Sequence, residues 1–270
     1  NRDFVPIRQR EELKNKSVSL KEIIEFVGND DPRAKVSWGA NPINYLPATI
    51  FSLPVDSVNF MKSINQSIDG RSATKISSAD TSETKIHTFS DNSPKLMKEF
   101  VWDIDKKGYI MKNDLLILDI LAANNWERPI YFAVTVGHDA YIGLEKHFQI
   151  EGLAYRLVPY QLQDERQPRV ATDIMYDNLM NKIHWGGLDK SEVWMDENNI
   201  RIAMTMRMQM RTLAMSLIQE GKKDSALKVL RKCAEVLPEK NVPYYHYESV
   251  SLSYTYYFIL AFYMADAQQD

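Results

Sequence analysis

Apolar residues near the carboxyl end of the chain recur at helical spacing, and one glycine divides them into two groups. Leu213 and Leu217 share one face of the first segment, and Ala226 and Leu230 share one face of the second. Positions three or four residues apart lie on the same side of a helix. Gly221, between the segments, can adopt the backbone conformation of a tight turn that a side chain would resist. The pattern predicts two helices that pack against each other as a hairpin.

This predicted hairpin has the spacing of a tetratricopeptide repeat, a helix–turn–helix unit of about 34 residues. Small residues at Ala214 and Ala226 let the two helices approach closely, and Pro238 ends the second helix. Repeats of this kind stack, so that each buries a face of the next. We therefore predict an all-α tetratricopeptide-like domain over residues 166–270 that is truncated at its carboxyl end. Its predicted helices are 173–183, 198–219, 222–237 and 244–267.

The preceding part of the chain has short apolar runs separated by turn residues, a pattern typical of a mixed α/β domain. A strand, a helix capped by Asn113 or Asp114, and a second strand follow one another over residues 100–136. This order predicts a βαβ unit with a partly parallel sheet. The predicted strands are 36–38, 48–53, 100–104, 109–111, 130–136 and 153–158, and the predicted helices are 21–27 and 115–124.

The predicted fold class is α+β, with a mixed α/β domain at residues 1–165 followed by the helical domain at 166–270. Ser, Thr, Asn, Asp and Lys dominate residues 62–94, which predicts a polar loop on the surface. The loop at 160–169 separates the last predicted strand from the first helix of the second domain. We expect the domain boundary there.

Composition places the chain among folded proteins, because 44% of its 270 residues are hydrophobic and 26% are charged. The net charge is -3, so a nucleic-acid partner is not expected. The single cysteine, Cys233, lies on the apolar stripe of a predicted helix, which favours a structural role. Residues 250–265 carry no charge but are fewer than the roughly 20 that span a bilayer, so no membrane span is expected. The first residue is Asn, and we expect the chain to be a piece of a longer protein.

The sequence has no strong signature of a catalytic or metal site. Its five histidines are never three or four residues apart, and the Cys-x-x-Cys spacing of zinc sites does not occur. A Gly-x-Ser-x-Gly nucleophile turn and a glycine-rich phosphate loop do not occur either. We therefore expect neither a metal nor a cofactor. His138 and Asp139 follow a predicted strand, where ligands bind in α/β sheets, and together with Asn113 they are the candidate enzyme site.

Six short segments give the chain a family resemblance. They are 1–4 (NRDF), 44–47 (NYLP), 110–114 (IMKND), 125–133 (NWERPIYFA), 151–159 (EGLAYRLVP) and 173–178 (DIMYDN). With these segments the chain resembles the soluble carboxyl-terminal region of large Bacteroidetes membrane proteins, a region long catalogued as a domain of unknown function. Those proteins are similar to the eukaryotic transmembrane protein O-mannosyltransferases. The resemblance extends over nearly the whole chain apart from residues 62–94.

The resemblance implies an amino-terminal domain with many membrane spans that uses a lipid-linked sugar. The catalytic acid would lie in a loop of that membrane domain, so the resemblance assigns no catalytic residue to this chain. It also implies that the chain lies on the periplasmic side of the inner membrane, tethered by its own membrane domain.

Three functions are consistent with the sequence. The first is a non-catalytic module that binds or positions an acceptor protein or glycan for a membrane glycosyltransferase-like domain. Its predicted binding residues are Met208, Arg211 and Met215, which share a stripe of the first hairpin helix away from Leu213 and Leu217. The second function is an enzyme that acts on glycans or lipids with the candidate site in the first domain. The third is a structural brace or dimerisation module.

Overall fold

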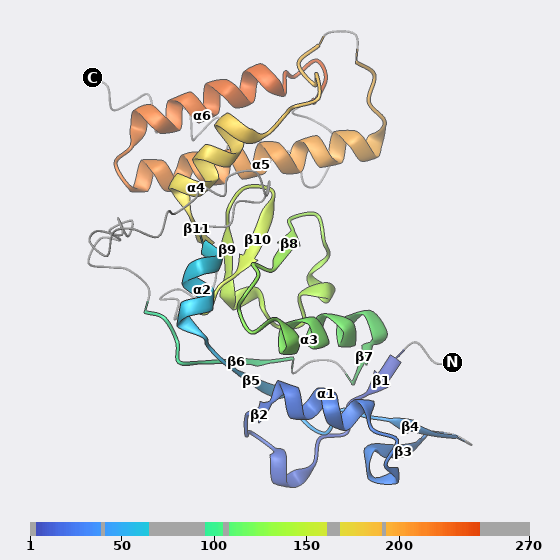
Figure 1. Cartoon of the computed structure of the whole chain (residues 1–270). Coiled ribbons are helices and arrows are strands. Elements are labelled where there is room, and N and C mark those ends of the chain that lie inside the picture. The colour runs from blue at the N-terminus through green and yellow to red at the C-terminus, as the bar shows by residue number, and fades with distance from the viewer. Residues whose placement is uncertain are drawn as a thin grey trace. The chain divides into compact units, whose positions relative to one another are not determined.

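The computed structural model (Figure 1) describes residues 4–38, 41–64, 95–104, 108–160, 168–190 and 193–243. The chain folds into two compact units, and the polypeptide passes between them several times. Both units contain strands and helices, so the predicted α+β class is confirmed. Unit 1 consists of Asn1–Ile130, Gly137–His147 and Leu157–Gln167, and unit 2 consists of Tyr131–Val136, Phe148–Arg156 and Pro168–Asp270.

The strands of unit 1 form one three-stranded sheet and two strand pairs. In the sheet, β5 (Ile50–Pro54) lies between β2 (Val18–Ser19), which is parallel to it, and β6 (Glu99–Asp103), which is antiparallel to it. Four of the predicted strands are found in this unit, close to their expected positions. The antiparallel pairs are β1 (Phe4–Pro6) with β7 (Tyr109–Met111) and β3 (Lys35–Trp38) with β4 (Asn41–Asn44).

Aromatic side chains fill the interior of unit 1. Phe100 of β6 lies 5.3 Å from Trp102 and 5.4 Å from Trp126, measured between ring centroids. The indole N–H of Trp126 donates a hydrogen bond of 2.9 Å to the carbonyl of Pro54. The helices of the unit are α1 (Leu20–Gly28), α2 (Ser57–Ile64) and α3 (Lys112–Asn124), and its 3₁₀ turns are η1 (Glu11–Leu13), η2 (Pro32–Ala34), η3 (His138–Tyr141) and η4 (Glu145–His147).

The start of α3 is fixed by a buried carboxylate. Asp114 accepts a hydrogen bond of 3.1 Å from the backbone N–H of Met111, the residue that precedes the helix. A carboxylate at the third helical position satisfies a donor that the helix start would leave open. The prediction that Asn113 or Asp114 caps a helix beginning at Leu115 is wrong, because α3 begins at Lys112, its N-cap is Met111, and Asp114 stands at the third helical position.

The sheet of unit 2 has four strands in the order β11–β9–β10–β8. Strand β8 is antiparallel to β10, and β11 is parallel to β9. The parallel pairing of β9 with β11 sets Gln149 beside Arg169, so these two strands are close in space although they come from segments well apart in sequence. The bounds are β8 (Tyr131–Ala133), β9 (Phe148–Ile150), β10 (Ala154–Leu157) and β11 (Arg169–Val170).

The predicted βαβ unit over residues 100–136 is wrong. The strand before α3, β7, pairs with β1, whereas the strand after α3, β8, pairs with β10. The two strands therefore belong to different sheets, and β8 is also shorter than predicted. Hydrophobic periodicity indicates where strands occur, but the partner of each strand depends on residues distant in sequence.

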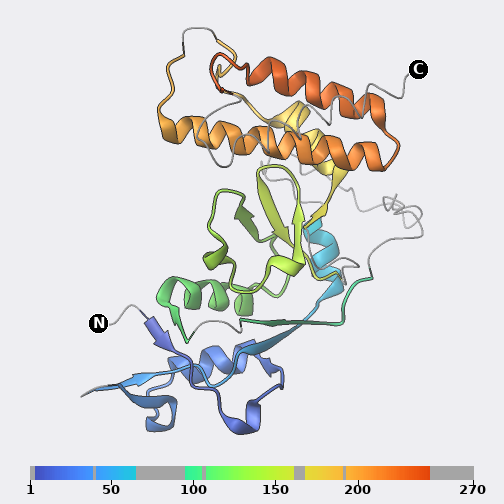
Figure 2. The same cartoon turned by 180° about the vertical axis from the view of Figure 1, so that it is seen from behind.

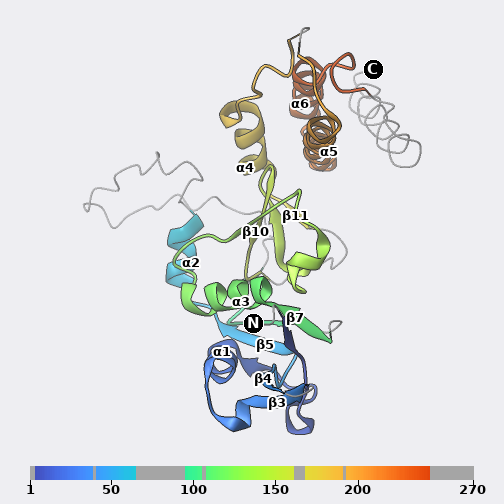
Figure 3. The same ribbon diagram turned by 90° about the vertical axis from the view of Figure 1, so that its right-hand side faces the viewer.

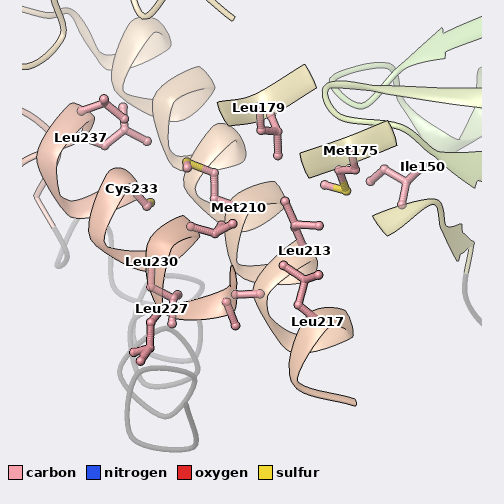
Figure 4. Close-up of a cluster of buried hydrophobic side chains, with 14 of the residues drawn as sticks. Ile150, Met175, Leu179, Met210, Leu213, Leu217, Leu227, Leu230, Cys233 and Leu237 are labelled. Carbon is pink, nitrogen blue, oxygen red and sulfur yellow. The ribbon is translucent and has the colours of Figure 1, made fainter. Parts of the chain in front are cut away.

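The two long helices of unit 2 form the predicted hairpin. They turn at Gly221, whose positive φ of 76° a side chain would strain. Leu213, Leu217 and Leu230 are buried in the shared apolar cluster (Figure 4). Figures 1 and 2 show the two helices side by side from opposite directions. The helices of unit 2 are α4 (Thr172–Asp177), which continues into the π-helix η5 (Asn178–Lys182), α5 (Glu197–Gln219) and α6 (Lys223–Val236).

The prediction of an all-α tetratricopeptide-like domain at residues 166–270 is not supported. In the described part of this region, only two helices follow Asp196, and the compact unit that holds them also contains a sheet. A repeat array buries its apolar faces by stacking further helix pairs. Here Ile150 of the sheet and Met175 and Leu179 of the α4–η5 segment share the apolar cluster of the hairpin.

A buried arginine fixes the chain beyond α6. Arg207 donates hydrogen bonds of 2.8 and 2.7 Å to the carbonyl oxygens of Leu237 and Val242. The amide of Asn241 donates bonds of 2.7 and 2.8 Å to the carbonyl oxygens of Leu188 and Lys190, in the segment before α5. Because Leu237 is the C-cap of α6, its hydrogen bond from Arg207 satisfies a carbonyl group that the end of the helix would otherwise leave without a partner.

Some predictions concern residues outside those described. They are the polar loop, of which 65–94 fall outside, residues 161–167 of the expected boundary, and the helix predicted at 244–267 with its uncharged run 250–265. Among the described residues, no helix has the length and the apolar character that crossing a bilayer requires.

The packing of the hairpin predicts the effect of a cavity. Leu230→Ala should lower the free energy of unfolding of unit 2 by about 2–5 kcal/mol, because the fully buried side chain leaves a hole that its neighbours fill only in part. Urea unfolding measures this loss. Ile202→Ala, at an exposed position of α5, should change the stability by only about 0.5 kcal/mol. An equal loss for both variants would contradict the packing described here.

Candidate functional site

One face of the sheet in unit 2 carries polar side chains. Gln149 and Arg169 face each other in the parallel register of β9 and β11. Alternation along these strands points the next residues, Ile150 and Val170, to the opposite face, where both pack with the helical apolar cluster. The sheet is therefore apolar toward the helices and polar on its other face.

Glu151 is the centre of a polar network on that face. Its carboxylate accepts hydrogen bonds from the Tyr131 hydroxyl at 2.8 Å and from the Gln149 amide at 2.7 Å. A guanidinium nitrogen of Arg156 lies 3.8 Å from the same carboxylate, and Arg169 donates a bond of 2.9 Å to the Gln149 carbonyl oxygen. Gln149, Glu151 and Arg156 are all buried. A buried carboxylate is stable only when such donors compensate its lost hydration.

The π-helix holds the backbone of this network. The Asn178 amide, in the first residue of η5, donates a hydrogen bond of 2.7 Å to the carbonyl of Glu151. Gly152 follows with a φ of 143°, and a Cβ there would lie 3.6 Å from the Asn178 Cβ. π-Helices occur as local insertions that place particular side chains. Here the insertion brings Asn178 against the turn between β9 and β10.

Electrostatics make Tyr131 a hydrogen-bond donor. Partial burial is the main cause that raises the pKa of the Tyr131 hydroxyl, and the negative charge of Glu151 is the second cause. The hydroxyl therefore stays protonated and keeps donating to the carboxylate. A group that retains its proton so firmly is a poor nucleophile or general base at neutral pH. The network is suited to holding the sheet in one arrangement.

No set of His, Cys, Asp and Glu side chains large enough to hold a metal ion occurs in the described ranges. Cys233 is fully buried, and its burial raises the thiol pKa to about 12. A thiol in that state is inert toward metals and electrophiles, since the thiolate is the reactive form.

The predicted binding residues lie together on one stripe of α5. Met208, Arg211 and Met215 are each half-buried, and their spacing of three and four residues places them on one side of the helix. Met215 also packs against the edge of the apolar cluster. The helix places the three residues on one stripe, and their role in binding stays a prediction.

The candidate enzyme site consists of exposed residues. His138 and Asp139 begin the short turn η3, and Asn113 lies in the first turn of α3. The imidazole of His138 contacts the ring of Tyr141 at a centroid distance of 5.3 Å. Catalytic electrostatics are strongest where water is excluded, which these exposed positions do not provide.

Sequence reasoning did not identify the polar network of Glu151. Its members extend along the chain from Tyr131 to Asn178, and no local motif joins them. A signal was nevertheless present, because Tyr131, Glu151, Arg156 and Asn178 all lie in segments that carry the family resemblance. Three of those segments therefore meet in one buried network.

Comparison with known families gives one match. Residues 73–175, less than half of the chain, match the family model described as TMEM260-associated domain 2, which is consistent with a TMEM260-related family. Glu151 and the four side chains Tyr131, Gln149, Arg156 and Arg169 fall inside the matched range, whereas Asn178, α5 and α6 lie outside it. Neither the curated proteins nor the solved structures contain a match to this chain.

The hydrogen bond from the Tyr131 hydroxyl to the Glu151 carboxylate predicts that removing this hydroxyl lowers the stability of the fold. Tyr131→Phe should lower the free energy of unfolding by about 1–3 kcal/mol, because a buried carboxylate loses a donor. Thermal or urea unfolding at neutral pH measures the change. Tyr109→Phe, at an exposed tyrosine of β7, is the matched control and should leave the stability unchanged.

The raised pKa of Tyr131 predicts a loss of stability in alkali. Above pH of about 10 the unfolded chain releases this proton before the folded chain does, so the free energy of unfolding falls as the pH rises. Tyr131→Phe should remove part of that decline between neutral pH and strong alkali. Parallel stability curves for the variant and the original chain above pH 10 would refute the assignment.

Proposed function

We propose that this chain is a non-catalytic periplasmic module of a membrane-embedded glycosyltransferase-like protein. The module binds or positions an acceptor protein or glycan, and the membrane domain of the same protein performs the sugar transfer. Its proposed place is the periplasmic side of the inner membrane, to which it is tethered.

The observation that carries this proposal is the half-buried stripe of α5. Met208, Arg211 and Met215 keep part of their surface accessible, while the Leu213 and Leu217 side of the same helix is fully packed. Methionine adapts its shape to different partners, and arginine is enriched among residues that dominate interfaces. A rigid helix that presents such a stripe is suited to docking.

The hairpin of α5 and α6 is proposed to act as a single tetratricopeptide-like docking element. Its small buried residues, Ala214 and Ala226, have the positions that such a unit requires for close helix packing. The tight turn at Gly221 keeps the two helices antiparallel. Such a unit binds partners and supplies no chemistry of its own.

The link to a membrane protein rests on the family comparison and the sequence resemblance. The matched range 73–175 contains the resemblance segments 110–114, 125–133 and 151–159. The family comparison supports a TMEM260-related family over this range, and the resemblance supports a membrane protein similar to the O-mannosyltransferases. The glycosyltransferase-like chemistry, the periplasmic location and the acceptor belong to the proposal.

Charge reversal on the stripe tests the proposal. The chain is immobilised and used to capture glycoproteins and glycans from envelope extracts, which mass spectrometry then quantifies. Arg211→Glu combined with Met215→Ala should reduce capture roughly tenfold, since central interface residues contribute most of the binding energy. Met208→Ala alone should give a smaller loss of the same captured species.

The matched control changes another face of the same helix. Ile202→Glu removes one apolar side chain and adds one negative charge at an exposed position of α5 outside the stripe. This variant should capture as much as the original chain. Unchanged capture by the stripe variant would contradict the proposal, and capture of nothing by any form would favour a structural brace.

A further inference from the structure

The outer side of α5 extends the docking stripe by one residue. Met204 lies one helical turn before Met208 and is half-buried like it. Met204, Met208, Arg211 and Met215 follow one another at spacings of four, three and four residues, so they form one row along the helix. The residues of α5 that are buried against α6 and α4 (Figure 3) lie on its other sides. We refer to these four residues as the α5 row.

The α5 row consists mainly of thioether side chains. Helix α5 holds five of the 12 methionines of the chain, at 204, 206, 208, 210 and 215. Met210 is fully buried in the apolar cluster, whereas the three methionines of the row keep part of their surface accessible. A methionine side chain is unbranched and flexible, and methionine-rich surfaces repack around partners of different shape. The row is therefore suited to apolar groups whose shape varies.

A glycan requires other groups from its binding site. Sugar hydroxyls donate and accept hydrogen bonds, and the C–H face of a sugar ring stacks on aromatic rings. On the accessible side of α5 between Met204 and Met215, no aromatic ring, carboxylate or carboxamide is present. The hydroxyls of Thr205 and Thr212, which flank the row, donate to carbonyl oxygens four residues earlier in the helix, at 3.1 and 3.0 Å. Their protons are therefore already engaged.

We infer that the α5 row binds an apolar segment of the acceptor polypeptide and does not bind a glycan. The inference rests on the proposed function, because it names the part of the acceptor that the stripe holds. The spacing of the row supplies the shape of that segment, since residues at intervals of four and three are the ones that meet when two helices lie side by side. An amphipathic helix therefore fits the row better than an extended strand or a sugar chain.

Charge adds a second requirement for the partner. Glu197 and Arg201 lie on the same side of α5 at its amino-terminal end, and their charged groups are 3.8 Å apart, so they largely neutralise each other. Arg211 lies within the row between Met208 and Met215. This side of the helix therefore has one positive charge in excess. A segment that carries apolar residues in a row and an acidic residue beside them complements it.

Methionine methyl NMR tests the inference on the full chain. Labelling with methyl-¹³C methionine gives one signal per methionine, and leucine substitutions assign the signals. A synthetic amphipathic helix of leucine, glutamate and lysine with a net negative charge should shift the signals of Met204, Met208 and Met215, whereas mannose oligosaccharides should shift none of them. Met61 and Met111, which are 44% and 40% exposed in unit 1, are the matched controls and should respond to neither probe.

Met208→Gln combined with Met215→Gln keeps the length of both side chains but replaces each thioether with an amide. Affinity for the peptide should fall about tenfold, because an amide loses hydrogen bonds to water when apolar groups cover it. A site that recognised sugar hydroxyls would keep or gain affinity for the oligosaccharides. Met61→Gln combined with Met111→Gln should leave peptide binding unchanged. The signal of buried Met210 should stay in place in both variants, which shows that the helix packing is intact.

Capture from envelope extracts separates this inference from the proposed function. Digestion of the extract with a protease should abolish capture, whereas glycosidase treatment should leave it unchanged. Capture that depends on the α5 stripe but survives the protease and is lost with the glycosidase would overturn the inference and leave the docking role in place. Row signals that respond to no peptide, or that shift with protein concentration alone as a second copy docks, would also overturn it. Loss of the docking role itself would appear as capture that the stripe variants leave unchanged.

Discussion

The close approach of α5 and α6 is the constraint on which the rest of unit 2 depends. Ala214 and Ala226 are fully buried between the two helices, and a larger side chain at either position would force them apart. Leu213, Leu217 and Leu230 fill the remaining space. Because this packing fixes the rotation of α5 about its axis, it also fixes which residues stay accessible on its other side. Residues supported by a packed helix hold a more defined geometry than residues on a loop.

The sheet of unit 2 connects this helical packing to a second, polar layer of interactions. Ile150 points into the apolar cluster, while the next residue, Glu151, gathers donors from Tyr131 and Gln149 on the other side of the strand. Replacing one member leaves a buried charge with too few partners, which makes such networks specific about their arrangement. Three of the six segments that give the chain its family resemblance meet in this network. A structural role for them agrees with a module whose chemistry lies elsewhere.

The sequence was informative about local features and uninformative about distant partners. The turn at Gly221 and the buried stripe around Leu213 depend on neighbouring residues, and their patterns predicted them correctly. The pairing of β1 with β7 joins segments about a hundred residues apart, and nothing in either segment specifies the other. That pairing is why the predicted βαβ unit failed.

The prediction of a tetratricopeptide-like domain failed for a related reason. The helical spacing was read correctly, but an apolar helix face does not reveal what covers it. Here Met175, Leu179 and Ile150 share the cluster of the hairpin, where a repeat array would use further helix pairs.

The central claim, that the α5 stripe docks an acceptor, is tested most directly by a photo-crosslinking residue placed at Met208 or Met215 in the native cells. The account predicts covalent adducts with glycosylated proteins from those positions and none from exposed Ile202 on the same helix, and adducts from Ile202 alone would contradict it.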